Sequence, residues 1–428
     1  MLLKTIGIGL LLMGTFFLFA CNDGGSGSSD GTGTVSVSLT DSTTDEYLAV
    51  YVTVADIQIR KNDNEDSSDD FNWKPLETEI DEPLQNRTYN LLKLVNGVTE
   101  AIGSNDFSEG IYHQIRLIIG DTPELDNNLL GDPHPFANYL ILNDGSNTIE
   151  QLKIPSGFQT GIKLVHPFRV LDGETKELVL DFDAGRSVVK AGNSGKYILK
   201  PTIRVFETTD KIDVYGEVTD SDTSNSIGNA TVSAQISDGL SATVIRSTIT
   251  DGATTQNDLL EEGEYLLSLL SPDQIYNIVV YKGQVDGKKE LIYSPECMVF
   301  RYNDDSELEP VLDFILSTDN LGIGTISGQV TVNGGVNSDF AFTVTVYTEL
   351  DCGRADREGY VEITKADIDD DFEGGTFEYS VKLPIYDTPV KYYVVASADG
   401  YIPGKNETTL SSAVQAVTEL DLVLVPTR

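Results

Sequence analysis

The carboxylates of Asp181 and Asp183 are the side chains that could support acid–base chemistry. They alternate with apolar residues, so in a β-strand both would face one side. A glycoside hydrolase needs two carboxyl groups that face each other across a substrate cleft. Arg186 is close enough in sequence to pair with one carboxylate, and Lys163 or Lys200 would balance the other from a neighbouring strand. A structural ion pair is the commoner use of such groups.

An acidic segment near the C-terminus carries oxygen ligands at alternating positions. Asp367, Asp369 and Asp371 alternate, and Glu378 stands at the twelfth position, which is similar to a calcium loop. Phe372 occupies the position where such loops need glycine. A weak Ca²⁺ site is therefore the one cofactor hypothesis, beside the commoner role of a solvated loop.

The histidines lack the partners that catalysis or zinc binding requires. His113, His134 and His166 are isolated, and the chain contains no His-x-His, Cys-x-x-Cys or Gly-x-Ser-x-Gly motif. The sequence therefore predicts a protein that is not an enzyme.

Aromatic side chains at strand edges or in loops can stack on sugar rings. This describes a set of candidate ligand-binding residues, for which packing is the alternative role. They are Trp73, Tyr139, Tyr215, Tyr302 and Tyr360.

The chain is strongly acidic. Its 428 residues include 29 Lys and Arg against 68 Asp and Glu, a net charge of -39. This charge excludes electrostatic binding to nucleic acid and argues against a peripheral hold on anionic lipid.

The N-terminus has the features of a secretory signal. Residues 1–20 combine a lysine with an apolar run that is short for a bilayer span. Leu18-Phe19-Ala20-Cys21 resembles the bacterial lipobox, which implies cleavage before Cys21 and its acylation. Residues 21–33 then form a flexible tether. Asn22 is not the aspartate of the inner-membrane retention signal seen in enteric-type lipoproteins, so we expect an outer-membrane anchor.

Strand-like alternation begins at Thr34–Thr40 and recurs between turn motifs up to Phe206. Leu91–Ile102 is predicted as one short helix. The pattern restarts after residue 209, and residues 210–318 and 319–428 repeat it with an offset of roughly 110 residues. The sequence thus predicts an all-β chain of three tandem β-sandwiches, with the first over residues 34–209.

Two cysteines remain after Cys21, and they lie far apart in the sequence. Cys297 and Cys352 are free to form a disulfide in an oxidising compartment, or to remain separate buried thiols.

Four stretches of the first domain occur in order: Tyr112–Leu117, Ile154–Leu164, Leu180–Val189 and Gly195–Arg204. With the lead strand Gly33–Thr40, they resemble the bacterial lipoprotein domain-of-unknown-function family 4382 over about residues 33–206. The family assigns no chemistry that the resemblance would imply here.

The two C-terminal repeats share a Val/Ile-x-Gly-x-Val-Thr opening at residues 214–219 and 326–331, and the second contains Ala398-Asp399-Gly400-Tyr401. They resemble carboxypeptidase-regulatory-type domains, which are transthyretin-like sandwiches. That resemblance implies spacers or ligand-binding attachments.

Together these features predict a non-enzymatic, lipid-anchored envelope protein that presents β-sandwich modules to a carbohydrate, a matrix or a protein partner. The alternatives are an envelope polysaccharide hydrolase that uses Asp181 or Asp183, and a purely structural envelope protein.

Overall fold

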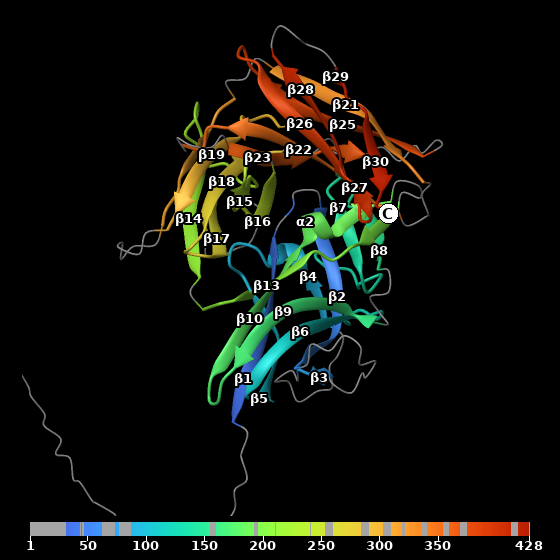
Figure 1. Ribbon diagram of the computed structural model, residues 1–428, viewed down its shortest axis with the longest axis vertical. Helices are drawn as coiled ribbons and strands as arrows, with labels where there is room; N and C mark the ends of the chain where they lie inside the picture. The colour runs from blue at the N-terminus through green and yellow to red at the C-terminus, as the bar shows by residue number, and fades with distance from the viewer. Residues whose placement is uncertain are drawn as a thin grey trace, which may run out of the picture.

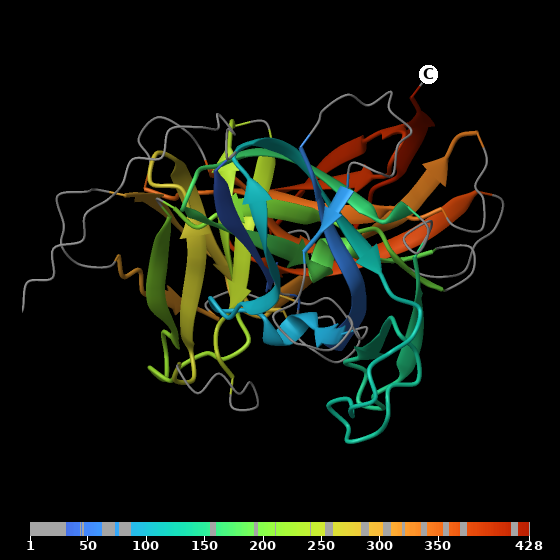
Figure 2. The same cartoon turned by 90° about the horizontal axis from the view of Figure 1, so that it is seen from below.

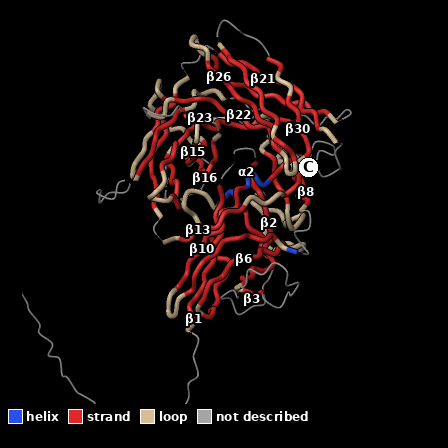
Figure 3. The backbone as a smooth tube through the Cα atoms, viewed as in Figure 1, coloured by secondary structure: helices blue, strands red, loops and turns tan. Residues whose placement is uncertain are grey.

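The computed structural model describes most of the chain. The described residues are 31–42, 44, 47–61, 73–76, 87–154, 160–191, 196–209, 211–239, 241–252, 260–283, 291–302, 310–318, 322–334, 340–353, 359–368, 375–411 and 418–427. Within them the chain is almost entirely β-structure (Figure 3). The predicted all-β class of β-sandwiches is confirmed. Among the described residues, no helix is long and apolar enough to cross a membrane.

The N-terminal sandwich consists of a smaller and a larger sheet. The smaller sheet has the order β13 (Ile203–Glu207), β10 (Thr175–Asp183), β1 (Thr32–Ser42) and β5 (Glu100–Ser108). The larger sheet has the order β11 (Val188–Lys190), β12 (Tyr197–Leu199), β8 (Ile149–Lys153), β7 (Tyr139–Leu142), β2 (Tyr47–Arg60), β6 (Gly110–Ile119) and β9 (Ile162–Val170). β3 (Trp73–Pro75) and β4 (Arg87–Asn90) also pair with β2.

Strand β1 shows why these residues form a sandwich. Val35, Val37 and Leu39 point into the core, while the serines between them are only half-buried. Its neighbour β10 runs parallel to it. The helix predicted over Leu91–Ile102 is wrong, because only the 3₁₀ turn η2 (Leu91–Lys93) forms and β5 begins at Glu100.

The second sandwich also has two sheets. One has the order β17 (Glu264–Leu270), β14 (Ile212–Asp220) and β20 (Phe314–Leu316). The other has the order β16 (Ala242–Ile249), β15 (Thr231–Ser237), β18 (Ile275–Tyr281) and β19 (Glu296–Arg301).

The third sandwich repeats this topology with additions. Its first sheet has the order β24 (Asp367–Ile368), β25 (Thr376–Ile385), β21 (Gly322–Val332), β30 (Leu422–Pro426) and β27 (Tyr401–Ile402), with β29 (Thr418–Glu419) on β21. Its second sheet has the order β23 (Gly359–Lys365), β22 (Thr343–Leu350), β26 (Val390–Ser397) and β28 (Gly404–Leu410). The series β17-β14-β20 corresponds to β25-β21-β30, with the same antiparallel and parallel pairings.

A tyrosine clamp recurs in both copies. The hydroxyl of Tyr265 donates to the carbonyl of Leu312 at 2.7 Å, and that of Tyr379 donates to the carbonyl of Leu420 at 2.5 Å. Tyr265 lies on β17 and Tyr379 on β25. Each hydrogen bond therefore links the closing segment of a sandwich to the strand that pairs with its opening strand. The repetition of one polar contact within one topology is what an internal duplication produces.

The glycine of each opening motif explains the shared Val/Ile-x-Gly pattern. A Cβ on Gly216 would collide with the carbonyl of Leu312, and a Cβ on Gly328 would collide with that of Leu420. Only glycine lets the closing segment approach β14 or β21 this closely.

The three sandwiches meet around the short helix α2 (Ala184–Ser187). In Figure 1 the third sandwich (orange to red) lies above the N-terminal one (blue to green), with the second beside both. The apolar core of the third sandwich includes Val279 and Leu291 from the second. The third sandwich therefore buries side chains of the second, although each has its own core.

Candidate functional site

Asp181 and Asp183 both lie on β10, as the alternation predicts, but they do not face solvent. The exposed fraction is 0% for Asp181 and 4% for Asp183. On the opposite face of the strand, Leu180 and Phe182 pack into the N-terminal core. From Leu178 onwards β10 is therefore buried on both faces, and Asp181 and Asp183 face the junction of the three sandwiches.

Asp181 pairs with a guanidinium from the second sandwich. Arg246 on β16 forms an ion pair with it, and both side chains are almost fully buried. The hydroxyl of Ser42 lies 3.1 Å from each carboxylate oxygen of Asp181. Arg246 also donates from Nε to the carbonyl of Ser268 and lies over the ring of Phe206. The ion pair thus joins the first two sandwiches, and both Asp181 and Arg246 are also held in place by the other contacts just described.

Asp183 belongs to a second chain of ion pairs, which reaches the third sandwich. Its Oδ2 lies 3.2 Å from Nε of Arg186, and Oδ1 accepts a bond from the Arg186 backbone N–H at 3.0 Å. Arg186 then donates from Nη2 to both carboxylate oxygens of Glu362 on β23, at 2.7 and 2.8 Å. Lys365, also on β23, donates to the carbonyl of Gly185.

These contacts settle which partners the two carboxylates have. Asp183 pairs with Arg186, one of the predicted partners. The prediction that Lys163 or Lys200 balances the other carboxylate is wrong. The strands beside β10 are β1 and β13, and Lys200 reaches instead towards Asp399 and the carbonyl of Ala341. Carboxylates held in buried ion pairs between domains do not line a substrate cleft, which a glycosidase requires.

The junction should make stability depend on pH. Burial raises the pKa of Asp183 to about 6, although Arg186 and Lys365 act in the opposite direction. Burial also raises the pKa of Asp41 well above its ordinary value, with Asp181 and Asp183 adding to the effect. Between the unfolded pKa of about 3.9 and the folded value of Asp183, the native state binds more protons than the unfolded state.

We therefore expect the free energy of unfolding to fall as the pH rises from 4 to above 6, with about 3 kcal/mol from Asp183 alone. Urea unfolding across this range measures the slope. The Asp183→Asn variant is the control, because it removes the titrating group and should show a flatter profile. Identical slopes in parent and variant would contradict the prediction.

The second and third sandwiches are joined by covalent and polar contacts. Cys297 on β19 and Cys352 after β22 form a disulfide, with a Cα–Cα distance of 4.7 Å. The side-chain amide of Gln235 clamps the backbone of Glu362, because it accepts from its N–H and donates to its carbonyl, each at 2.8 Å. Val299 N–H donates to the carbonyl of Cys352 at 2.7 Å. The alternative of two separate thiols does not apply to this structure.

The predicted aromatic residues are dispersed, and the structure does not bring them together on one surface. Tyr139 and Tyr360 are buried, so neither presents a free ring face for sugar stacking. Trp73 is half-buried, with Arg116 lying 4.6 Å from its ring centroid. Tyr215 is half-buried on β14, and Tyr302 packs against the core of the second sandwich.

The candidate calcium ligands are only partly described. Asp367 lies on β24 and Glu378 on the neighbouring β25, while Asp369 and Asp371 lie outside the described residues. Within the residues described, no group of three or more potential ligands is placed to hold a metal. The weak Ca²⁺ site therefore stays a prediction. Cys21 also lies outside the described residues.

Two of the three histidines have carboxylate neighbours. His134 is buried, with Nε2 3.1 Å from Asp126 and Nδ1 3.0 Å from the hydroxyl of Tyr139. Nε2 of His166 lies 3.5 Å from Glu207. These contacts hold loops and strands together.

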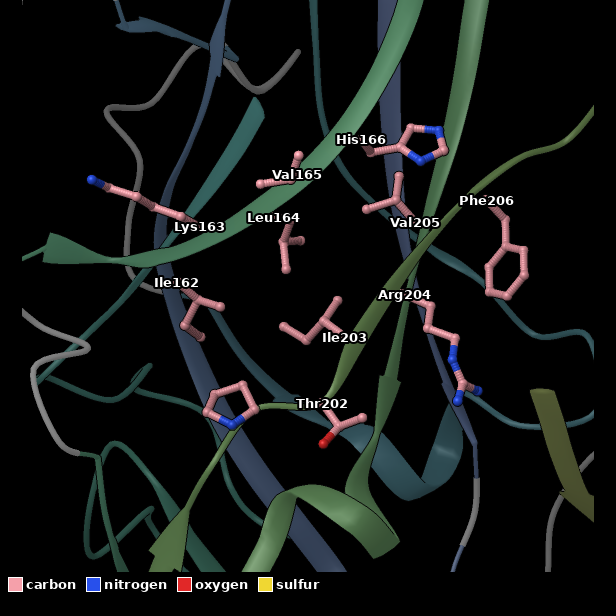
Figure 4. Close-up of a pocket in the computed structure, with 11 residues that line it drawn as sticks. Ile162, Lys163, Leu164, Val165, His166, Thr202, Ile203, Arg204, Val205 and Phe206 are labelled. Atoms are coloured by element: carbon pink, nitrogen blue, oxygen red, sulfur yellow. The ribbon is translucent and has the colours of Figure 1, made fainter. Parts of the chain in front are cut away.

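A groove of about 640 Å³ separates β9 from β13. Both strands end their sheets, and Figure 4 shows Ile162, Leu164 and Ile203 pointing towards one another across it. Arg204 points away and donates to the carbonyl of Ile245 in the second sandwich. The β9 edge has a register shift opposite β6, as well as Pro167, and both features discourage the addition of another strand.

Comparisons with known proteins agree with part of the sequence analysis. Residues 32–201 match the model of a family described as a domain of unknown function, DUF4382. This confirms the resemblance stated for the N-terminal domain. The resemblance of the repeats to carboxypeptidase-regulatory-type domains stays a prediction. A search of curated proteins found no match.

Solved structures with some likeness include pilins and an adhesin. The shaft pilin SpaA from Lactobacillus rhamnosus GG has a TM-score of 0.17 and 8% identity, covering 51% of this chain and 98% of its own. A streptococcal ancillary pilin has a TM-score of 0.17 and 11% identity, covering 92% and 100%. A putative adhesin from Bacteroides ovatus has a TM-score of 0.19 and 8% identity, covering 50% and 88%. At these TM-scores the likenesses support no inference about function.

Proposed function

We propose that this chain is a non-enzymatic envelope protein, anchored by lipid at Cys21, that holds three β-sandwiches as one rigid display unit. The observation that carries the proposal is the use made of Asp181 and Asp183. Each is committed to an arginine at the junction, where the pairs connect all three sandwiches. The side chains that would serve a hydrolase thus serve interdomain packing.

Rigidity supports a display role. The disulfide, the Gln235 clamp and the apolar contacts of Val279 and Leu291 all act between the second and third sandwiches. A surface held by several independent contacts loses less conformational entropy when it binds than a chain of loosely linked domains does. Such a body, on an acylated and flexible tether, would present a fixed surface away from the membrane.

The ligand class under this proposal is a carbohydrate, a matrix component or a protein. Tyr215 and Tyr302 are the tyrosines of the predicted set that are not fully buried. Carbohydrate stacking would therefore use these two rings or that of half-buried Trp73, whereas Tyr139 and Tyr360 are buried.

The test compares the full chain with its Cys21→Ser variant. We expect the parent in the membrane fraction with incorporated acyl label, and the variant to be released without label. Both proteins are then applied to a glycan array and to envelope polysaccharides, with and without calcium. Binding without release of product is expected; reducing-sugar release that Asp181→Asn or Asp183→Asn abolishes would overturn the proposal.

A further inference from the structure

The connection between β6 and β7 is an ordered loop that exposes large apolar side chains. This 120–138 loop projects from the N-terminal sandwich, in teal at the lower right of Figure 2. Leu125 is 97% exposed, and Leu129, Leu130 and Phe136 are each 37–42% exposed. Single exposed leucines need no explanation, but a group of them on one loop that is held in place does.

Hydrogen bonds fix the two ends of the loop together. Asn138 donates from Nδ2 to the carbonyl of Gly120 at 2.8 Å and accepts from the backbone N–H of Thr53 at 3.0 Å. The hydroxyl of Thr53 donates to the carbonyl of Ala137 at 2.6 Å. The two ends of the loop therefore meet at β2, a strand of the larger sheet.

A buried aromatic and histidine cluster holds the middle of the loop. His134 bridges Asp126 and Tyr139, and its ring packs edge-on against Tyr51. Tyr51 stacks on Tyr139 and accepts a hydrogen bond from the backbone N–H of Leu129 at 2.8 Å. His134, Tyr51 and Tyr139 are thus buried, while the leucines of the loop are exposed.

The tip has its own support. Asn128 Oδ1 accepts from the backbone N–H groups of Leu130 and Asp132, and Gly131 adopts a positive φ of 83°. Glu124 and Thr88 exchange two hydrogen bonds, which fasten the start of the loop to β4. The loop is therefore organised independently of its exposed apolar groups, as binding loops on rigid scaffolds are.

The charge around these apolar groups favours one kind of partner. Residues 117–152 contain no lysine or arginine but six acidic residues. They are Asp121, Glu124, Asp126, Asp132, Asp144 and Glu150. Anionic lipid would be repelled, and insertion into any bilayer would desolvate the carboxylates beside Leu125. A partner with basic groups around an apolar pocket would match both the exposed apolar side chains and the negative charge.

We propose that the 120–138 loop is a docking surface for a protein partner whose apolar pocket is rimmed by lysine and arginine side chains. The proposal rests on the proposed function of the chain as a binding module and names the surface that binds. Leu125, Leu129, Leu130 and Phe136 supply the apolar contact, and the four acidic residues of the same loop supply orientation and rate of association.

The probe is a set of short synthetic peptides in which a Leu-Phe pair is flanked by lysine and arginine. Matched peptides carry glutamate at the flanks, or serine in place of the apolar pair. Binding to the full chain is compared with binding to the Leu125→Ser/Leu130→Ser variant. We expect the parent to prefer the cationic apolar peptides and the variant to lose about tenfold or more in affinity.

The matched control is Ile315→Ser, which removes an exposed aliphatic side chain (63% exposed) from β20. It should bind as the parent does. Equal binding by parent and loop variant would overturn the proposal, because it would show attraction to the acidic surface in general. No retained peptide, or binding only to phosphatidylethanolamine vesicles, would overturn it too. None of these results would contradict the proposed display function, because hydrolytic activity is the result that contradicts it.

Discussion

Arg246→Met should lower the free energy of unfolding by about 3–5 kcal/mol, because it leaves a buried carboxylate without its counter-charge. Asp181 is 0% exposed and Arg246 is 3% exposed. Methionine fills much of the arginine's volume, so the loss reports the missing charge more than a cavity. Urea unfolding of the full chain, followed by circular dichroism, measures the change.

The double variant Arg246→Met/Asp181→Asn should recover part of that loss. It removes both charges and keeps an oxygen that can accept from Ser42. The matched control is Arg169→Met; the Arg169 side chain is 66% exposed and its Nη2 lies 3.9 Å from Oε1 of Glu109. An exposed pair of that kind contributes about 0–1 kcal/mol. Equal losses from Arg246→Met and Arg169→Met would mean that the junction pair is not energetically important.

Local sequence patterns predicted much of the fold. Alternation in Thr34–Thr40 corresponds to the alternate burial of β1. The strand pattern that extends to Phe206 is divided at its end, because Lys200, Pro201 and Thr202 connect β12 in the larger sheet to β13 in the smaller sheet. Period and turn chemistry therefore located strands better than they located strand ends.

The incorrect helix shows where local reasoning failed. Leu91–Ile102 contains apolar residues at spacings that fit a helix, but only Leu91–Lys93 form a helical turn, of the 3₁₀ type. Asn96 and Gly97 both have positive φ, which ends any helix, and β5 then pairs with β1. The burial of Ile102 in the N-terminal core, on a strand paired with β1, therefore outweighed the local helical pattern.

The contacts at the junction could not be predicted from the sequence, for a different reason. Asp181, Asp183 and Arg186 were identified, yet Arg246, which pairs with Asp181, and Glu362, which pairs with Arg186, come from other domains. No period or spacing links residues in separate sandwiches. Gln235 was missed for the same reason, because it contacts Glu362 in another sandwich. The 120–138 loop was missed because Thr53 and Thr88, which fix its ends, are distant from it in the sequence.

Reduction of the Cys297–Cys352 disulfide should cost about 4 kcal/mol of stability, on the chain-entropy relation for a loop closed over this separation. The two cysteines are 55 residues apart and both are buried. The bond restrains the unfolded chain across the boundary between the repeats, so its loss should act mainly on that pair of sandwiches. Urea unfolding with and without reductant measures the difference in midpoint.

The controls separate the bond from general effects of reductant. The Cys297→Ser/Cys352→Ser variant should have the lower midpoint in both conditions and no response to reductant. In a Cys21→Ser background, the denatured and unreduced chain should contain no reactive thiol; two would show that the bond does not form. If the bond forms but reduction leaves the midpoint unchanged, then the Gln235 clamp and the shared apolar contacts alone hold the repeats together. The rigid unit would in that case persist in a reducing compartment, and redox state would not control display.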